Sequence, residues 1–491
     1  MKLKSAPLNL HGRGYFKGVF FVLLLALAGC PTQREEIDSY RKVVDAGVSN
    51  PNSYQPGQPL SLSRAMLLAN EDNEQIGLQG ENYVQAMIAK SRAIAAFLPT
   101  VSFQPDFTVE QAPRNGVSSN IASGTPQTSA SARGYVIRGD TWQRFEAPVT
   151  GAMNFSVVSY PNLRSTEQAI VQERQLLLDA QATLLLSVAQ TYYQVLLSEA
   201  QVRVLESSLK VQEARLTDAQ SRFRNHLALA LEVSQTQAEV AATEVSLTQS
   251  RSDVRNGRHM LAFLIGAAEV EGPLVDEVVL PVNLPTVNDF RVYAATHRED
   301  LLGAESAVRA AKYAVDAAIA EYYPSVSLNV SGFLYRQYFS DASKWDAILI
   351  GNLPIFSAGI IEANVRFAWS RLRQQALYQA ELLRQIDRDV QIAYDNLLTS
   401  SQKLVGLQEE VQAASDSLNQ SEQLLKNQLA INLDVLTAQD TLLSAQLNYS
   451  SEEISHTIYY MDLLRITGQL DPHSPKYWRS AALPSAIPTG F

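Results

Sequence analysis

The segment FRNHLALALEVSQTQ (Phe223–Gln237) aligns without gaps on LKNQLAINLDVLTAQ (Leu425–Gln439), 202 residues further along the chain. A second pair of segments also matches, because AKSRAIAAFLP ends at Pro99 and VDAAIAEYYP ends at Pro324. Repetition of whole segments in the same order indicates a structural unit that occurs more than once. The sequence therefore predicts two successive copies of one unit.

Each copy contains apolar residues at intervals of seven. The first run is Val188, Val195, Val202, Leu209, Leu216 and Phe223, and the second is Val390, Leu397, Leu404, Val411, Leu418 and Leu425. The repeat resumes at Val233 and Val435, and His456 breaks it in the second copy. A seven-residue apolar repeat is typical of coiled-coil packing, and a helix of about 60 residues spans ~90 Å. We predict a long helical hairpin in each copy, although an ordinary helical bundle explains the periodicity alone equally well.

The period changes from seven to two ahead of each hairpin. Apolar and polar residues alternate over 101–109 and 145–157 in the first copy and over 325–331 in the second, with a weaker candidate at 345–353. This alternation predicts strands with one apolar and one polar face. Strands of roughly ten residues are long enough to cross a membrane when tilted.

Four strands in one chain leave two open sheet edges. Unpaired backbone groups cost several kcal/mol each in lipid, so the edges must pair with other copies of the chain. Three copies related by cyclic symmetry supply twelve strands. A soluble β-sandwich packed against helices is the competing explanation, but it does not account for the length of the hairpins.

The N-terminus has the features of a secretory signal peptide. Four basic residues precede the apolar stretch 19–28, and no acidic residue occurs before Cys30. The stretch is too short to span a bilayer, and it ends in LAGC, which resembles the lipobox of bacterial lipoproteins. We therefore expect removal of residues 1–29 and acylation of Cys30, the only cysteine in the chain. Cleavage moves the formal charge from −10 to −14, which argues against binding nucleic acid.

The order of these elements resembles the TolC-like outer membrane factor family. HREDLLGAESAVRAAKYAVDAAIAEYYPSVSLNVSG (His297–Gly332) is similar to the entry motif of that family's second half, and LPIFSAG (Leu353–Gly359) to its strand-to-helix turn. The resemblance implies a mainly α fold with membrane β-strands: a homotrimer with a twelve-stranded β-barrel, continued by a periplasmic α-helical barrel. It also implies an outer membrane channel of a tripartite efflux or secretion system, which conducts substrates passively from an inner membrane pump and a periplasmic adaptor protein.

The resemblance places the functional residues at the hairpin tips. Asp434 matches a family position in an acidic ring near the channel entrance, and Glu232 is its counterpart in the first copy; a solvated surface carboxylate is the alternative for both. The candidates for adaptor contact flank the tips: Arg224, Asn225, Leu227, Lys426, Asn427 and Leu429. His226 and Gln428 stand where family members usually have glycine.

The expected boundaries follow from these patterns. They are a signal peptide over 1–29, a lipidated tether over 30–58, a first repeat over 59–285, a second repeat over 286–471 and a tail over 472–491. The expected strands lie at about 100–110, 144–157, 325–335 and 345–353, and the hairpins at about 163–268 and 358–468.

No enzyme motif is present in the sequence. The six histidines are scattered, and there is no HExxH, phosphate-binding loop or nucleophile elbow, so we expect no catalytic residue, metal site or cofactor. Two other functions stay open: a periplasmic coiled-coil scaffold lipoprotein without channel activity, and a free-standing porin. Long hairpins argue against the porin, because porins have short periplasmic turns.

Overall fold

The computed structural model describes residues 33–44, 54–55, 57–111, 141–276, 278–281, 284–336, 344–427 and 429–470. The signal peptide, Cys30, Gln428 and the tail lie outside the described residues. The chain divides into two compact units, of which unit 2 comprises Ala86–Ile170 and Ser306–Leu377, and unit 1 comprises the rest. No helix in the described part is long and apolar enough to cross a membrane.

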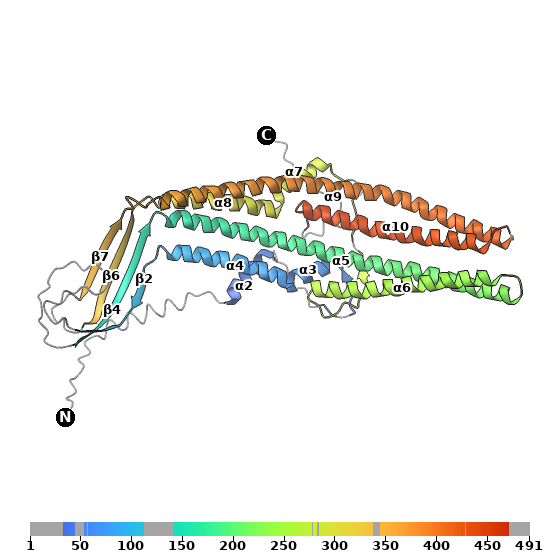
Figure 1. Cartoon of the computed structure of the whole chain (residues 1–491), viewed down its shortest axis with the longest axis horizontal. Coiled ribbons are helices and arrows are strands. Elements are labelled where there is room, and N and C mark those ends of the chain that lie inside the picture. Colours follow the sequence, from blue (N-terminus) through green and yellow to red (C-terminus); the bar gives the residue numbers. More distant parts are fainter. Residues whose placement is uncertain are drawn as a thin grey trace, which may run out of the picture. The chain divides into compact units, whose positions relative to one another are not determined.

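Unit 1 is built around two helical hairpins (Figure 1). The first consists of α5 (Ser159–Arg224) and α6 (Ala230–Leu264), and the second of α9 (Ile360–Lys426) and α10 (Asn432–Ile466). The first turns of α5 and α9 belong to unit 2. Pro161 stands in the first turn of α5, where its missing N–H costs no helical hydrogen bond, so the helix begins before the position expected from the sequence.

The seven-residue repeat explains why the helices of each hairpin pair. Val188, Val195 and Val390 are fully buried, and Leu397 is 2% exposed. Burial decreases toward the tip, where Phe223, the last residue of the first run, is 45% exposed. Packing of apolar side chains therefore holds each hairpin most firmly away from its tip.

Ion pairs fix the register of the first hairpin. Arg251 on α6 lies 2.8 Å from Glu206 on α5, and Arg258 lies 2.6 Å from Glu199. In the second hairpin, Lys403 on α9 lies 3.8 Å from Glu452 on α10. These pairs are partly exposed, so they specify alignment more than they stabilise the fold.

Each repeat starts with two helices joined at a single residue. They are α3 (Leu62–Asp72) and α4 (Glu74–Ala95) in the first repeat, and α7 (Val287–His297) and α8 (Glu299–Ala320) in the second. At the first joint, Asn73 accepts a hydrogen bond from the Gln75 N–H at 2.9 Å and donates one to the Leu264 carbonyl at 3.1 Å. The polar side chain at the joint therefore caps one helix while it binds the end of another.

The expectation of a tether over 30–58 is wrong for part of that segment, because Gln33–Val44 forms helix α2. The ring of Tyr40 lies against Gly80 of α4, where a side chain would have no room. The Gln181 amide of α5 donates a hydrogen bond to the Val44 carbonyl at 3.1 Å. Burial of Tyr40 and Val44 against unit 1 gives this helix a fixed position.

Two short parallel strands, β1 (Leu60–Ser61) and β5 (Leu274–Val275), close unit 1 beside α5. Tyr192 of α5 is fully buried beneath them. Its hydroxyl lies 2.7 Å from the Leu60 carbonyl and 2.8 Å from the Val275 carbonyl. One side chain thus joins a helix to both strands.

Unit 2 contains the sheet (Figure 1). Its strands are β2 (Thr100–Phe103), β3 (Asp106–Gln111), β4 (Thr141–Ser156), β6 (Ser325–Arg336) and β7 (Trp345–Asn352), in the order β2-β4-β6-β7 with β3 also paired to β4. The single strand expected at 100–110 is divided into β2 and β3, because Pro105 lies between them and has no N–H for the ladder.

Replacement of Tyr192 by Phe tests the joint between α5 and the two short strands. We expect Tyr192→Phe to lower the free energy of unfolding by about 1–3 kcal/mol, because the Leu60 and Val275 carbonyls lose the one hydroxyl proton that they share. Denaturant unfolding of the detergent-solubilised protein measures this. Tyr378→Phe is the matched control, because Tyr378 is 56% exposed. Equal shifts in the two variants would contradict the assigned role of the hydroxyl.

Candidate functional site

The tip of the first hairpin closes with a left-handed residue. His226 has a φ of 61°, and the N–H of Leu227 donates to the Arg222 carbonyl at 2.8 Å. This six-to-one hydrogen bond is typical of the Schellman motif, in which glycine usually occupies the left-handed position. His226, which stands where family members usually have glycine, is therefore the residue that adopts the strained backbone conformation.

The tip of the second hairpin has the same closing bond, because the Leu429 N–H donates to the Leu424 carbonyl at 2.8 Å. Asp434 lies in the first turn of α10, where its carboxylate accepts a hydrogen bond from the Ile431 N–H at 3.0 Å. Asp434 is exposed and Glu232 is half-buried. Asp434 thus caps its own helix while its charge stays in solvent.

The expected adaptor contacts all lie at the two tips and are exposed: Arg224, Asn225, Leu227, Lys426, Asn427 and Leu429. Arg224 bonds within its own helix, to the Gln220 carbonyl at 3.4 Å and to Ser221 Oγ at 3.3 Å. Leu227 and Leu429 belong to a larger set of aliphatic residues that are 48–75% exposed: Leu227, Leu229, Leu231, Leu429, Ile431 and Leu433.

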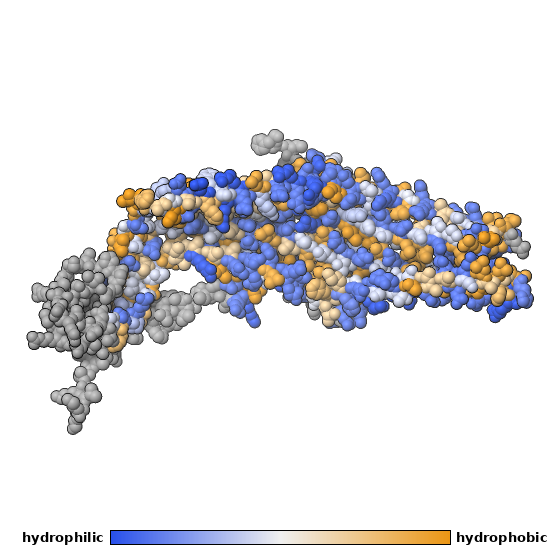
Figure 2. Space-filling model, viewed as in Figure 1, coloured by the Kyte–Doolittle hydropathy of each residue, from blue (hydrophilic) through white to orange (hydrophobic). Residues whose placement is uncertain are grey.

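Figure 2 shows apolar side chains gathered at the hairpin tips, at the right of the view. The aliphatic residues stand at alternate positions in LALAL and LAINL. This alternation is the sequence signal that could have identified further tip residues as candidates for partner contact. They are Leu229, Leu231, Ile431 and Leu433. Each tip therefore presents apolar surface to solvent beside its charged and amide side chains.

Sequence reasoning missed the contacts between the two hairpins. The Asn432 amide of α10 donates to Thr236 Oγ1 of α6 at 3.2 Å, and Arg215 of α5 forms an ion pair with Glu422 of α9. A third contact joins the carboxyl groups of Glu239 on α6 and Asp440 on α10. We call these three contacts the hairpin seam. They join residues 215 and 422, 236 and 432, and 239 and 440. No local pattern marks these residues, because each partner lies about 200 positions away.

The carboxyl pair in the seam has unusual acid–base behaviour. The hydrogen bond with Asp440, partial burial and the negative charge of Asp440 raise the pKa of Glu239 to about 7. Two carboxyl groups within hydrogen-bonding distance keep one proton between them, because two ionised groups repel and have no donor. Glu239 therefore ionises near neutral pH.

The sheet of unit 2 has two chemically different faces. The paired registers place Phe103 opposite Val149, Val149 opposite Gly332, and Gly332 opposite Trp345. The same face carries Val101, Gly151, Val330, Ala347, Met153, Leu328, Leu349, Phe155, Val326 and Gly351. The other face carries Ser102, Thr150, Ser331, Asp346, Asn154, Ser327 and Asn329 along with Ala152, Ile348 and Ile350. The described residues leave the apolar face uncovered, since Val101, Phe103 and Leu349 are 56–69% exposed.

Both edges of the sheet are open. Among the described residues, β7 pairs only with β6, and β2 and β3 pair only with β4. A two-faced sheet with open edges matches a strand arrangement in which one face contacts lipid and the other contacts water.

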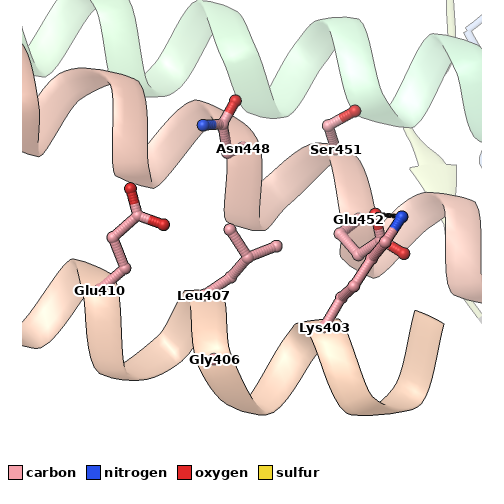
Figure 3. Close-up of a pocket in the computed structure, with 7 residues that line it drawn as sticks. All are labelled: Lys403, Gly406, Leu407, Glu410, Asn448, Ser451 and Glu452. Carbon is pink, nitrogen blue, oxygen red and sulfur yellow. Dashed lines mark ion pairs between the residues drawn. The ribbon is translucent and has the colours of Figure 1, made fainter. Parts of the chain in front are cut away.

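A groove of about 430 Å³ lies between α9 and α10 (Figure 3). It is lined by Lys403, Gly406, Leu407, Glu410, Asn448, Ser451 and Glu452. Figure 3 shows Lys403 reaching across the groove toward Glu452. The described residues contain no group of three or more His, Cys, Asp or Glu side chains arranged to hold a metal ion. The groove is an open polar surface of the hairpin, in contrast to the apolar tips.

The sequence profile of the outer membrane efflux protein family matches residues 292–469. Residues 292–469 therefore carry the sequence pattern of this family. The family consists of channel proteins, and the chain is an outer membrane component of an efflux system.

Several curated relatives match a large part of the chain. The toluene efflux pump outer membrane protein TtgC of Pseudomonas putida is 27% identical over 337 residues, which is 65% of this chain and 68% of TtgC. The cation efflux system protein CusC of Escherichia coli is 22% identical over 323 residues, 62% of this chain and 68% of CusC. The probable outer membrane lipoprotein SilC of Salmonella typhimurium is 23% identical over 268 residues, 53% of this chain and 58% of SilC.

Solved structures of efflux channels have the same fold. CusC superposes with a TM-score of 0.71 at 17% identity, covering 86% of this chain and 98% of CusC. The open state of the MtrE outer membrane channel of Neisseria gonorrhoeae superposes with a TM-score of 0.67 at 17% identity, covering 86% of this chain and 96% of MtrE. The TolC-like fold expected from the sequence is confirmed, whereas the trimer and the twelve-stranded barrel stay predictions.

Glycine at the first tip should relieve the strain at His226. A left-handed conformation costs a non-glycine residue roughly 1–2 kcal/mol, and glycine loses about 0.5–1 kcal/mol through its greater freedom when unfolded. We expect His226→Gly to raise the free energy of unfolding by up to about 1 kcal/mol. His226→Ala is the control, because it removes the imidazole but keeps the strain. An equal gain in both variants, measured by denaturant unfolding, would show that the side chain and not the backbone is responsible.

Proposed function

We propose that three copies of this family member form a channel through the outer membrane, with a twelve-stranded barrel continued by a periplasmic barrel of helices. The two-faced sheet with open edges carries the proposal. In lipid its edges need partners, and the neighbouring copies of the same sheet supply them. The apolar face then contacts lipid, and the polar face lines water.

The channel conducts substrates passively, and the chain itself performs no catalytic step. A periplasmic adaptor and an inner membrane pump supply substrate and energy, as the family resemblance implies. The exposed aliphatic residues beside Arg224, Asn225, Lys426 and Asn427 give the adaptor an apolar contact with polar surroundings at each tip. The efflux systems named for TtgC and CusC support export as the function.

Acylation of Cys30 anchors each copy in the membrane. The LAGC sequence supports this modification, and the name of SilC as a lipoprotein agrees with it. Several acyl chains, at about 0.8 kcal/mol per buried CH₂, hold the N-terminus on the lipid surface. Helix α2 follows closely, so the anchored segment is short.

Native mass spectrometry of the protein extracted from the outer membrane fraction tests the assembly. We expect a trimer with acyl mass on every chain, because single chains leave the sheet edges unpaired. Cys30→Ala is the control for the acyl mass and should leave the trimer intact. A stable monomer would support the scaffold function and overturn the shared barrel.

The carboxylate of Asp434 should make the entrance selective for cations, because three symmetry-related copies place three charges around one opening. We expect Asp434→Asn to move the cation-to-anion permeability ratio toward one, measured as the reversal potential across a planar bilayer under a salt gradient. Asparagine keeps an oxygen that can cap α10, so the helix start is retained. Asp416→Asn, on the exposed surface of α9, is the control. An unchanged permeability ratio in Asp434→Asn would show that Asp434 does not line the entrance.

A further inference from the structure

The four connections between the sheet and the helices lie at one end of the sheet (Figure 1). They lead from α4 to β2, from β4 to α5, from α8 to β6 and from β7 to α9. The strand register places them together, because Thr100 pairs with Ala152, and Ser325 pairs with both Ser156 and Asn352. In the proposed barrel, this end of the sheet therefore marks the boundary between the membrane and the periplasm.

These connections carry apolar and aromatic side chains that the described residues leave exposed. The most exposed ones lie between β7 and α9, where Ile355 is 93% exposed and Phe356 is 88% exposed. The others are 49–58% exposed: Leu98, Val157, Tyr322, Tyr323 and Leu353. We call these seven residues the collar. Figure 2 shows apolar side chains at the end of the helices that adjoins the strands, and exposed apolar surface of this kind indicates contact with a partner or a membrane.

The turn that carries Ile355 and Phe356 is closed by two successive left-handed residues. Ala358 has a φ of 49° and Gly359 a φ of 82°. The Ile360 N–H donates to the Ser357 carbonyl at 3.0 Å, and the Ala363 N–H donates to the Gly359 carbonyl at 2.9 Å. Two exposed side chains therefore stand on a hydrogen-bonded turn at the start of α9.

The collar continues the apolar face of the sheet. The last row of that face consists of Phe155, Val326 and Gly351. Two positions beyond Phe155 and Gly351, Val157 and Leu353 extend the apolar alternation into the connections. Lipid that covers the face of the sheet therefore also reaches the collar. The tyrosines of the collar suit the boundary of a bilayer, because the ring is apolar and the hydroxyl can bind water.

The helices next to the collar are basic, although the whole chain has a formal charge of −10. The helical segments of unit 2, at 86–95, 159–170, 306–320 and 360–377, contain eight basic residues and three acidic ones. Five of the basic residues are exposed and form neither an ion pair nor a hydrogen bond within the described part of the chain: Arg92, Lys312, Arg366, Arg371 and Arg373. Positive charge beside an apolar collar matches the surface of a membrane that contains anionic lipid.

Distance along the helices selects two of these cations. Arg92 stands three residues before the end of α4, and Arg366 stands six residues after the start of α9. At 1.5 Å per residue, these positions lie about 5 Å and about 9 Å from the connections. The headgroup region on one side of a bilayer is roughly 5–8 Å thick, and long basic side chains extend toward the phosphates. Arg371 and Arg373 lie about 17 Å and about 20 Å away, farther than charges act through physiological salt.

We propose that the collar, together with Arg92 and Arg366, binds the anionic phospholipids of the inner leaflet of the outer membrane. The apolar side chains of the collar enter the boundary between hydrocarbon and headgroups, and the two guanidinium groups bind lipid phosphates. The inference rests on the proposed barrel, whose apolar face it extends. It adds the class of lipid and the depth at which this end of the sheet lies in the membrane.

Photo-crosslinking in the outer membrane tests the position of the collar. The probe p-benzoylphenylalanine, incorporated at position 356 of the full-length chain, should form adducts with phospholipid that mass spectrometry detects. An adduct with a second copy of the chain would show that a neighbouring subunit covers the turn, and it would overturn the proposal, as would the absence of any adduct. The same probe at Val405, which is 61% exposed on α9 in unit 1, is the control and should form no lipid adduct.

A probe on the sheet separates failure of this inference from failure of the barrel. Leu349 lies on the apolar face of β7 and is 69% exposed. Lipid adducts at position 349 without lipid adducts at position 356 would support the barrel and overturn the role of the collar. Absence of lipid adducts at both positions would overturn the collar and the lipid contact of the sheet together.

Retained lipid tests the preference for anionic headgroups. The full-length protein is reconstituted in bilayers with equal amounts of phosphatidylglycerol and phosphatidylethanolamine, and native mass spectrometry measures the ratio of the two lipids that stay bound. The wild type should retain phosphatidylglycerol preferentially, and Arg92→Gln with Arg366→Gln should lower the ratio roughly fivefold for each charge removed. The matched control is Arg203→Gln with Lys210→Gln, which removes two exposed charges from α5 in unit 1. Equal ratios in the two double variants would overturn the assigned role of Arg92 and Arg366.

Discussion

Backbone groups at the edge of a sheet must find partners, and in lipid no water supplies them. This constraint determines how the two parts of the chain work together in the proposed assembly. In the described part of the chain, the sheet of unit 2 ends in unpaired strands on both sides, and its apolar face is exposed. Pairing with neighbouring copies satisfies the edges, and lipid covers the apolar face. The helices α5 and α9 of the two hairpins each follow a strand of this sheet along the chain, β4 and β7 respectively.

The hairpins change character along their length. Near the strands β1 and β5 their interior is apolar and closely packed, with Tyr192, Val188 and Val195 fully buried. Near the tips the buried positions combine apolar residues such as Val240 and Val435 with Thr236, Gln439 and Gln212, and polar pairs join the two hairpins. Local stability follows the density of buried apolar contacts, so the tips are the region of the hairpins that opens at the lowest cost.

Long periodic elements could be predicted from the sequence because their information is local. The seven-residue repeats predicted the helices of the hairpins, and the alternation at 145–157 and 325–331 predicted the strands β4 and β6. The prediction was wrong where a single residue decides the structure, as at Pro105 between β2 and β3. It was also wrong for α2, whose helix depends on the fit of Tyr40 against Gly80. Asp434 was located through the family resemblance, and the adaptor candidates were located by their position beside the tips. The structure places these residues at the tips, but it does not test their roles.

The seam could not be predicted because the duplication does not preserve it. The repeat relates Arg215 and Glu422 to Ser417 and Gln220, and Glu239 and Asp440 to Thr441 and Ala238. In a ring of six hairpins, the repeat-related positions would face one another between neighbouring copies. The seams within a chain would therefore carry the ion pair and the carboxyl pair, while the seams between chains would carry neutral residues. Two kinds of seam in such a ring would lower its symmetry from sixfold to threefold.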